Sequence, residues 1–391
     1  MPKLLQINVC SAVLSTGKIA EDIANKARES RWETYMAWGR FSKPSPSIQI
    51  RVGSKVDTYI HFAEHKLFDR EGLASKKATR KLIKQIEKIS PDIIHLHNIH
   101  DHYLNYPLLF GYLAKADIPV VWTLHDCWAF TGGCMYYDLQ NCDRWKTGCM
   151  NCPEHRALFC DTTKKQYALK RELLERINNL TYVPVSNWLE HAVLESHQKH
   201  RPVVTIHNGI DINLFKPQKQ LRDNKRFRII GVAAVWDKRK GLEDFIKLHS
   251  SLPEKEFDIT LVGLTKKQIR SLPNGINGIT RTTNIQELVQ LYSDADVFIN
   301  TTYSDNFPTV NLEALACGTP VITYRTGGSP EAVDEKTGIV VEQGDLNGIV
   351  SAIERLRESP LSSEACRKRA EEHFDKDKCF MKYIKLYESL L

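Results

Sequence analysis

Two carboxylates stand eight positions apart where a helix is expected to begin, near the carboxyl end of the chain. Asp305 precedes this helix and Glu313 lies just over one turn inside it, in a segment that follows an apolar strand. Free amides around Pro308–Val310, at a helix N-terminus, would attract a phosphate or pyrophosphate. Two carboxylates beside an anion repel it unless they accept hydrogen bonds from neutral hydroxyls. The spacing therefore indicates a ligand that carries both phosphate and sugar hydroxyl groups.

A basic loop offers positive charge for the same ligand. Lys238, Arg239 and Lys240 stand together before Gly241, directly after an apolar strand. Two or three fixed cations can neutralise the negative charge of a phosphate or pyrophosphate group without a metal ion. A run of solvated charges is the alternative interpretation.

Two residues of the first half could lie in the same site. His125 follows the predicted strand Val120–Leu124, and Gly17 stands between the first predicted strand and the first predicted helix, where the backbone must approach a ligand. A structural histidine is the alternative for His125. His95 and His97 lie on another predicted strand, where we expect one ring in the cleft and one packed, rather than a metal site.

A cysteine cluster forms a separate candidate site on an insertion over residues 127–160. Its pattern is Cys134-x7-Cys142-x6-Cys149-x2-Cys152. Four thiolates at such spacing could bind a structural zinc ion, and a closed shell of four leaves no position for catalysis. Cys127 could replace Cys134 as a ligand. Unliganded thiols, or a redox or disulfide role, are the alternatives.

Apolar strands and amphipathic helices alternate along the chain, which predicts an α/β fold with parallel sheets. We expect two Rossmann-like domains: residues 1–207, with the cysteine-rich insertion, and residues 208–375. A final helix in residues 376–391 could cross back to the first domain. Ligands bind at the carboxyl edges of such sheets, so the expected active site is the cleft between the domains. The predicted strands are Leu4–Val9, Ile93–His97, Val120–Leu124, Tyr182–Val185, Phe227–Val232, Ile259–Val262, Val297–Asn300 and Val321–Tyr324.

Bulk properties suit a globular protein of this kind. The 391 residues are 42% hydrophobic and 26% charged, and no apolar run is long enough to span a bilayer. The N-terminus lacks the pattern of a secretion signal, so we expect a cytoplasmic protein.

The net charge of +7 comes from residues 1–208, which hold 28 basic and 21 acidic residues, against 26 of each in the remainder. A basic helix face there could rest on the inner face of the cytoplasmic membrane; a solvated face is the alternative. This face consists of Lys76, Lys77, Arg80, Lys81, Lys84 and Lys88.

The segment Asp305-x7-Glu313, which continues as Ala314-Leu315-Ala316-Cys317-Gly318-Thr319-Pro320-Val321, resembles the signature of retaining GT-B glycosyltransferases of family four. The cysteine-rich segment resembles a segment found in a subset of bacterial family-four transferases that act in the synthesis of colanic-acid-like exopolysaccharides. Aspartate replaces the family's first glutamate, and Val235 stands where the family has an arginine.

The resemblance implies a role for each candidate residue. Asp305 would contact the donor hexose and Glu313 the ribose, while Lys240, with Arg239 or Lys238, would hold the diphosphate. His125 would reach the donor sugar and phosphate. The resemblance also places further residues in the donor site: Gly17, Asn306, Phe307, Pro308 and Thr309. Asp305, Lys240 and His125 are the predicted catalytic residues.

The predicted function is transfer of a hexose from a UDP- or GDP-sugar to a glycan acceptor, lipid-linked in the favoured interpretation. The resemblance implies retention of anomeric configuration, no catalytic metal, and a place in bacterial surface or exopolysaccharide biosynthesis. An epimerase of nucleotide sugars with the same fold is one alternative. The other is a zinc-containing nucleic-acid-binding protein, although the basic residues lack the interleaved aromatics that would stack on bases, so we expect no nucleic-acid partner.

Overall fold

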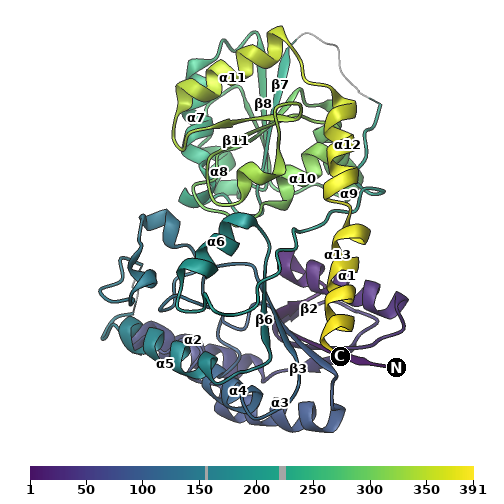
Figure 1. Ribbon diagram of the computed structural model, residues 1–391. Coiled ribbons are helices and arrows are strands. Elements are labelled where there is room, and N and C mark those ends of the chain that lie inside the picture. Colours follow the sequence, from purple (N-terminus) through teal and green to yellow (C-terminus); the bar gives the residue numbers. More distant parts are fainter. Residues whose placement is uncertain (155–156, 220–225) are drawn as a thin grey trace. The chain divides into compact units, whose positions relative to one another are not determined.

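The computed structural model of the protein describes residues 1–154, 157–219 and 226–391. The described chain divides into two compact units. One contains Met1–His207 together with Phe380–Leu391, and the other contains Asn208–Cys379. The polar stretch expected to precede Arg226 falls mostly in 220–225, outside the described residues. Figure 1 shows the alternation of strands and helices in each unit.

The N-terminal unit contains a six-stranded parallel sheet in the order β3-β2-β1-β4-β5-β6. The central strand β1 is buried over nearly its whole length, as expected for a parallel strand covered on both faces. The strands are β1 (Lys3–Ser11), β2 (Glu33–Ser42), β3 (Ile48–Arg51), β4 (Ile93–Leu96), β5 (Val120–Leu124) and β6 (Leu180–Pro184).

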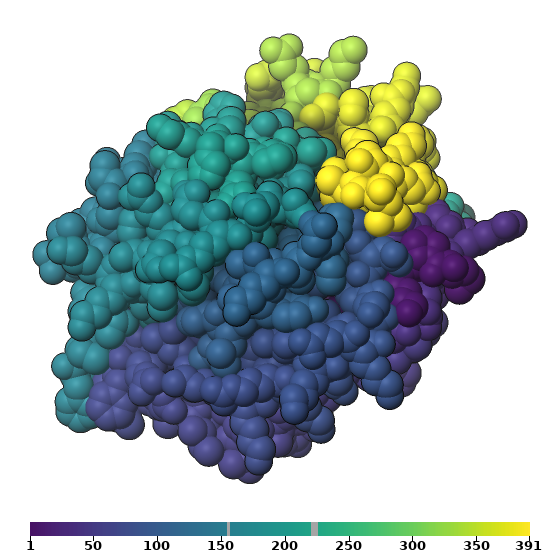
Figure 2. All heavy atoms as spheres, turned by 60° about the horizontal axis from the view of Figure 1, so that its bottom comes forward, coloured from purple at the N-terminus to yellow at the C-terminus, as the bar shows by residue number. Residues whose placement is uncertain are grey.

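Helices connect most of these strands, and in the cysteine-rich insertion after β5 the described residues form two short 3-10 turns. Helix α2 begins with a capping box in which Ser54 and Asp57 bond each other's backbone amides. The helices are α1 (Leu14–Glu29), α2 (Lys55–Phe68), α3 (Lys76–Ile89), α4 (Tyr106–Leu113), α5 (Thr163–Glu175) and α6 (Asn187–Glu195), and the 3-10 turns are η1 (Tyr137–Gln140) and η2 (Arg144–Lys146). In Figure 2 the purple-to-blue part of the chain that includes α2 and α3 covers the lower surface of this unit.

The C-terminal unit repeats the plan with a parallel sheet in the order β12-β11-β10-β7-β8-β9. Its strands are β7 (Phe227–Val232), β8 (Phe257–Val262), β9 (Ile276–Ile279), β10 (Val297–Asn300), β11 (Val321–Tyr324) and β12 (Gly338–Val341). Its helices are α7 (Leu242–Ser251), α8 (Lys266–Arg270), α9 (Ile285–Asp294), α10 (Thr309–Ala316), α11 (Leu346–Glu358) and α12 (Ser363–His373), with 3-10 turns η3 (Lys238–Lys240) and η4 (Ser329–Ala332). The predicted α/β class with two parallel sheets is confirmed.

The last helix, α13 (Lys376–Leu390), begins in the C-terminal unit and ends in the N-terminal unit. Two of its tyrosines are fully buried in the N-terminal unit. The Tyr383 hydroxyl accepts a hydrogen bond from Thr123 Oγ1 at 3.0 Å, and the Tyr387 hydroxyl lies 2.6 Å from His95 Nδ1. The end of this helix is therefore part of the core around β4 and β5.

Candidate active site

Both sheets reverse their strand order beside the first strand of the unit. β1 lies between β2 and β4, and β7 lies between β8 and β10. At such a reversal the loops that follow two neighbouring strands run in opposite directions, which leaves room for a ligand at the carboxyl edge of the sheet. The predicted site residues lie on the connections that follow β1, β5, β7 and β10.

The loops after β7 and β10 are joined by hydrogen bonds. The amide of Tyr303 donates to Arg239 O at 2.7 Å, and the Arg239 guanidinium donates to Ser304 O at 2.9 Å. Gly241 has a φ of 69°, and a Cβ at this position would lie 2.2 Å from Thr301 O. Only glycine permits both this backbone conformation and this contact. The basic loop and the acidic loop therefore form one surface.

Lys240 and Asp305 form an ion pair on that surface. The Lys240 ammonium donates a hydrogen bond to Asp305 Oδ2, and Arg239 Nη1 lies 3.9 Å from the same oxygen. The two paired side chains are 15% and 20% exposed, so water and ligands can reach both. The sequence predicted separate contacts for these groups and did not predict the pair.

A second glycine supports the acidic loop from the other side. Gly327 has a φ of 52°, and a Cβ on it would lie 1.9 Å from Asp305 O. Nearby, the Asn311 amide donates to Ser329 Oγ at 3.0 Å, and that oxygen lies 2.6 Å from Thr323 Oγ1. Ser329 is the first residue of the 3-10 turn η4, and its hydroxyl belongs to this buried network.

Helix α10 begins at Thr309, so Pro308 is its N-cap rather than its first helical residue. Pro308 makes no side-chain capping hydrogen bond to this N-terminus, which suits a helix end that binds an anion. Glu313, one turn on, accepts a hydrogen bond from the Tyr292 hydroxyl at 3.1 Å.

The three predicted donor-site residues directly before α10, Asn306, Phe307 and Pro308, are all buried. Asn306 is 3% exposed, and the ring of Phe307 packs against Phe374 with centroids 5.8 Å apart. The Phe307 side chain therefore fixes the loop. A ligand at this surface would be reached by the backbone of this segment rather than by that ring.

In the N-terminal unit, His125 is the last of a chain of hydrogen-bonded groups that crosses three strands. Gln6 Nε2 donates to Ala20 O at 2.8 Å, which orients the Gln6 amide oxygen toward His97 Nε2, 2.8 Å away. His97 Nδ1 then lies 3.1 Å from His125 Nε2, and the two rings are stacked. The sequence predicted His125 but not its two partners.

These contacts determine which ring nitrogens carry protons. Burial, followed by the neighbouring histidines, holds the pKa of His97 well below its usual range, so His97 is neutral. Its Nε2 donates to Gln6, which leaves Nδ1 as an acceptor, so His125 Nε2 must donate to it. Burial lowers the pKa of His125 to about 4, so at neutral pH this ring is also neutral and its Nδ1 is an acceptor.

His95 and His97 are both fully buried, so the expectation that one would face the cleft is wrong. Gly17 also differs from its predicted place: α1 begins at Leu14, which puts Gly17 in the first helical turn. A Cβ on Gly17 would lie 2.9 Å from Cys10 Sγ. Glycine is therefore explained here by the packing of α1 on the end of β1.

A model of "Glycosyltransferase Family 4" matches residues 19–214, half of the chain, and a model of "Glycosyl transferases group 1" matches residues 226–359. The chain belongs to glycosyltransferase family 4. The two matches cover both units and the loops that carry His125, Lys240 and Asp305.

Curated relatives of this family 4 transferase include WcaC of Escherichia coli (strain K12), named for colanic acid biosynthesis, at 23% identity over 89% of both chains. The sulfoquinovosyl transferase SQD2 of Arabidopsis thaliana is 25% identical over 76% of this chain and 56% of its own length.

Solved structures show the same fold. Sucrose-phosphate synthase from Thermosynechococcus elongatus superposes with a TM-score of 0.74 at 18% identity, over 100% of this chain and 99% of that one. Anabaena Alr3699/HepE in complex with UDP superposes with a TM-score of 0.67 at 17% identity, over 100% of both chains. The transferase therefore has the GT-B fold that its motifs indicated.

The tautomer of His125 in this transferase predicts a kinetic effect of Gln6. Gln6→Met removes the acceptor for His97 but keeps the volume, and we expect kcat to fall about 10-fold or more, as for other groups that orient a catalytic imidazole. Gln6→Glu keeps an acceptor and should retain more activity, with a changed acid limb in the pH profile of kcat. Gln49→Leu, on the exposed edge strand β3, is the control. Equal loss in both Gln6 variants would show that packing alone matters.

Beside His125, a buried ion pair joins His100 and Asp126. His100 Nε2 lies 2.8 Å from Asp126 Oδ2, and the other oxygen of this carboxylate accepts from the Trp128 amide at 2.9 Å. Burial alone would lower the pKa of His100, but Asp126, then Glu71 and Asp101, raise it to about 9. His100 is therefore an imidazolium at neutral pH, next to a neutral His125.

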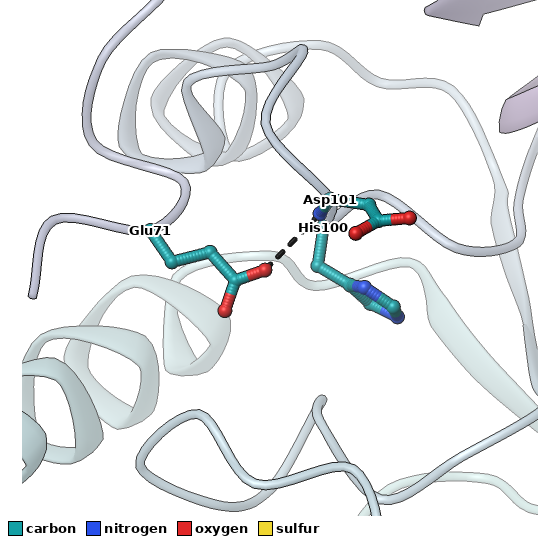
Figure 3. Close-up of side chains that lie close together, drawn as sticks. All are labelled: Glu71, His100 and Asp101. Atoms are coloured by element: carbon teal, nitrogen blue, oxygen red, sulfur yellow. Dashed lines mark hydrogen bonds between the residues drawn. The ribbon is translucent and has the colours of Figure 1, made fainter. Parts of the chain in front are cut away.

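Figure 3 shows the other side of His100, where Glu71 and Asp101 approach it. One potential ligand atom from each of the three residues lies within 4.8 Å of the others, the one such group in the described part of the chain. Asp101 N donates to Glu71 Oε1 at 3.1 Å, and Arg40 pairs with Asp101 at 3.2 Å. The His100 proton and Arg40 already supply positive charge here, so this arrangement needs no metal.

The raised pKa of His100 predicts how stability depends on pH. Because its pKa rises from 6.5 to about 9 on folding, its contribution of about 3 kcal/mol is complete below pH 6.5 and is lost as pH rises through 9. We expect His100→Gln to be less stable than wild type at pH 6. The difference in their free energies of unfolding, measured with urea, should shrink toward pH 10. His200→Gln, at an exposed pair with Glu175, should show little gap at any pH. A difference in the free energy of unfolding that stays constant with pH would contradict the assignment of His100 as an imidazolium.

A surface pocket of about 520 Å³ lies elsewhere in the C-terminal unit. It is lined by Phe227, Asp296 and Pro320, at the amino ends of β7, β10 and β11. Parallel sheets bind their ligands at the carboxyl edge, so this cavity is not the candidate active site.

Proposed function

We propose that this transferase moves a hexose from a nucleoside diphosphate sugar to a glycan acceptor with retention of configuration, in bacterial exopolysaccharide biosynthesis. The observation that carries the proposal is the surface at the β7–β10 reversal. There Arg239, Lys240 and the uncapped N-terminus of α10 provide positive charge, and Asp305 and Glu313 provide acceptors for hydroxyl groups. This combination suits a ligand that has both a diphosphate and sugar rings.

The proposed reaction needs no protein nucleophile. The bond between the anomeric carbon and the β-phosphate oxygen breaks, and a bond from the acceptor oxygen forms on the same face. The acceptor proton passes to the departing phosphate. Lys240 turns from Asp305 to the diphosphate as negative charge develops there, because a dianion attracts the ammonium more strongly than one carboxylate does. Asp305 then accepts hydrogen bonds from the hexose, and Glu313 from the ribose.

His125 is proposed to act from the N-terminal unit as a neutral imidazole. Its Nδ1 is an acceptor in the tautomer set by His97 and Gln6, which suits a hydrogen bond from a sugar hydroxyl. A neutral ring also leaves the acceptor hydroxyl free of an adjacent positive charge, so its proton goes to the phosphate.

The comparisons support the class of donor and of product. Alr3699/HepE was crystallised with UDP and with UDP-glucose, and WcaC is named for colanic acid biosynthesis. We infer a UDP- or GDP-hexose donor and a glycan acceptor, carried on a lipid, for this chain. Membership in a glycosyltransferase family favours transfer over nucleic-acid binding.

A thermal-shift screen against UDP-, GDP- and ADP-sugars tests the donor proposal. A ligand at about 100 times its Kd adds about 2.7 kcal/mol to stability, which is readily measured. The donor that binds is then incubated alone and with acceptor glycans, and NMR of the product identifies the anomer. Conversion of the donor without acceptor would indicate an epimerase, and an inverted linkage would contradict retention.

We further propose that the N-terminal unit rests on an anionic membrane surface. No helix in the described residues has the length and apolar character to span a bilayer. However, α2 exposes Val56, Tyr59 and Ile60 at 64%, 72% and 54%. Leu158 and Phe159 are also exposed and lie at the C-terminal end of the same helix, where Leu158 N bonds Lys66 O and the Phe159 ring packs on Phe68.

The charges near this surface favour lipid as the partner. All six basic residues predicted on α3 are exposed. A surface that is both basic and apolar binds anionic lipid by electrostatic attraction and by burial of its apolar side chains. Co-sedimentation should retain more protein on vesicles with phosphatidylglycerol than on phosphatidylcholine alone. Ile60→Glu should reduce that retention, while Leu194→Glu on α6 should not. Equal binding to both vesicle types would contradict the proposal.

A further inference from the structure

The cysteine-rich insertion brings four separated cysteines to one small cavity. Cys134, Cys142, Cys149 and Cys152 all line a space of about 20 Å³, beneath Trp145. A space of 10–15 Å³ is enough for one water-sized occupant. We propose that these four residues bind one zinc ion as thiolates and that the ion is structural.

The sulfurs surround the cavity without yet closing on its centre. In the parts of the chain that the structure describes, no three of them lie within 4.8 Å of one another, whereas tetrahedral Zn–S bonds of about 2.3 Å place sulfurs about 3.8 Å apart. Zinc binding therefore requires the loops to move inward. The described residues of these loops form the 3-10 turns η1 and η2, so this movement would break no long helix or strand among them.

Backbone amides already approach three of the sulfurs. Gly132 N donates to Cys149 Sγ at 3.2 Å, and Tyr136 and Glu154 provide backbone hydrogen bonds to Cys134 and Cys152. N–H donors of this kind stabilise a thiolate more than a thiol, because the acceptor is charged. The polypeptide thus presents donors where metal-bound thiolates would need them.

A buried lysine provides the complementary charge. Lys170 is 0% exposed, and its ammonium donates to Trp128 O at 2.6 Å and lies 3.8 Å from the centre of the Trp128 ring. Burial lowers the pKa of Lys170 to about 7, while the charges of Glu71, Cys149, Asp126 and Cys134, in that order, raise it. Four thiolates around Zn²⁺ leave a charge of −2, which would add to the negative charge that Glu71 and Asp126 place near this buried lysine.

The insertion has only a small core of its own. Trp145 packs on Phe130 and Tyr137 with ring centroids 5.2 and 4.7 Å away, and further contacts join the insertion to surrounding elements, such as Tyr137 with Trp188 and Leu158 with Lys66. A metal or a disulfide commonly stabilises so small a core, and none of the ten cysteines forms a disulfide. Since the insertion begins at Cys127, directly after His125 and Asp126, the ion would also hold the end of β5 in place. Binding releases four thiol protons for each Zn²⁺ bound.

The test measures metal rather than activity, so its result is independent of the proposed transfer. We expect full-length protein, purified without chelators, to contain about one zinc per chain by inductively coupled plasma mass spectrometry. Cobalt exchanged into the site should give the absorption of a tetrahedral thiolate complex. Single replacements of the four cysteines by serine should reduce the bound zinc to near none, whereas Cys160→Ser should keep it. Cys160 is an exposed thiol of the same insertion that does not line the cavity.

Poor folding of a variant would not obscure the result. Wild-type protein treated with a strong chelator should unfold at a lower temperature, and added zinc should restore the original value. Absence of zinc from the wild type, zinc retained in all four variants, or disulfides between these cysteines in the mass spectrum of protein isolated under reducing conditions would each overturn the proposal.

Discussion

Lys240→Ala is expected to lower kcat by about 10²–10³-fold, the usual cost of removing one group that stabilises developing charge. The physical reason is the diphosphate leaving group, whose charge increases as the glycosidic bond breaks. In the free protein Lys240 is paired with Asp305, so its removal leaves the more distant Arg239, 3.9 Å away, to compensate that carboxylate beside the donor phosphates. Affinity for the donor should therefore fall as well.

The matched control for this variant is Lys247→Ala, which removes the same charge from an exposed position on α7. Steady-state kinetics with the donor found in the screen, together with calorimetric titration of the nucleoside diphosphate, measure both effects. If Lys240→Ala keeps the wild-type kcat and donor Kd, the assignment of the β7–β10 surface to the diphosphate is wrong.

Gly327→Ala is expected to be among the most damaging single-methyl substitutions in the C-terminal unit. The new Cβ would stand 1.9 Å from Asp305 O, a separation that neither backbone can keep. The acidic loop must move, or the unit loses about 3 kcal/mol or more of stability. In either case Asp305 leaves its place beside Lys240, and donor binding weakens.

The variant Gly344→Ala distinguishes two possible causes of the effect at Gly327: the steric overlap with Asp305 and the strain of a positive φ. Gly344 also has a positive φ, 79°, but a methyl group added to it would have Tyr303 Oη as its nearest neighbour, at 3.5 Å. We expect it to cost about 1 kcal/mol, the ordinary difference between glycine and alanine in this conformation. Urea unfolding and donor titration of both variants check the comparison. Similar losses in the two would show that strain, not the contact with Asp305, explains the glycine.

The apolar strands could be located from sequence to within a residue or two. Val120–Leu124, Val297–Asn300 and Val321–Tyr324 agree fully with β5, β10 and β11, because central parallel strands are continuous apolar runs. Strand β2 was missed, since it mixes aromatic and polar residues with Gly39 and alternates between buried and partly exposed positions. β9 was missed because its four residues contain an asparagine and a glycine.

Only those parts of the candidate site that form a local sequence motif could be predicted from the sequence. The motif around Asp305 and Glu313 marks a loop and a helix N-terminus, but it cannot show that Lys240 pairs with Asp305. That pair exists because Gly241 and Gly327 let two other loops approach the acidic loop from either side. The partners of His125 are hidden for a similar reason: Gln6 and His97 are 91 positions apart, and parallel pairing of β1 with β4 brings them together.

The position of Tyr383 and Tyr387 has a consequence for how the protein is made. His95 and Thr123, at the centre of the first sheet, obtain hydrogen-bond partners from a segment that is synthesised more than 250 residues later. The N-terminal unit therefore cannot complete its core during translation of its own residues. Before α13 is synthesised, His95 Nε2 and Thr123 Oγ1 can still bond each other, but each side chain lacks the hydrogen bond that a tyrosine of α13 supplies. A nascent chain halted before Phe380 should therefore be a preferred substrate for chaperones.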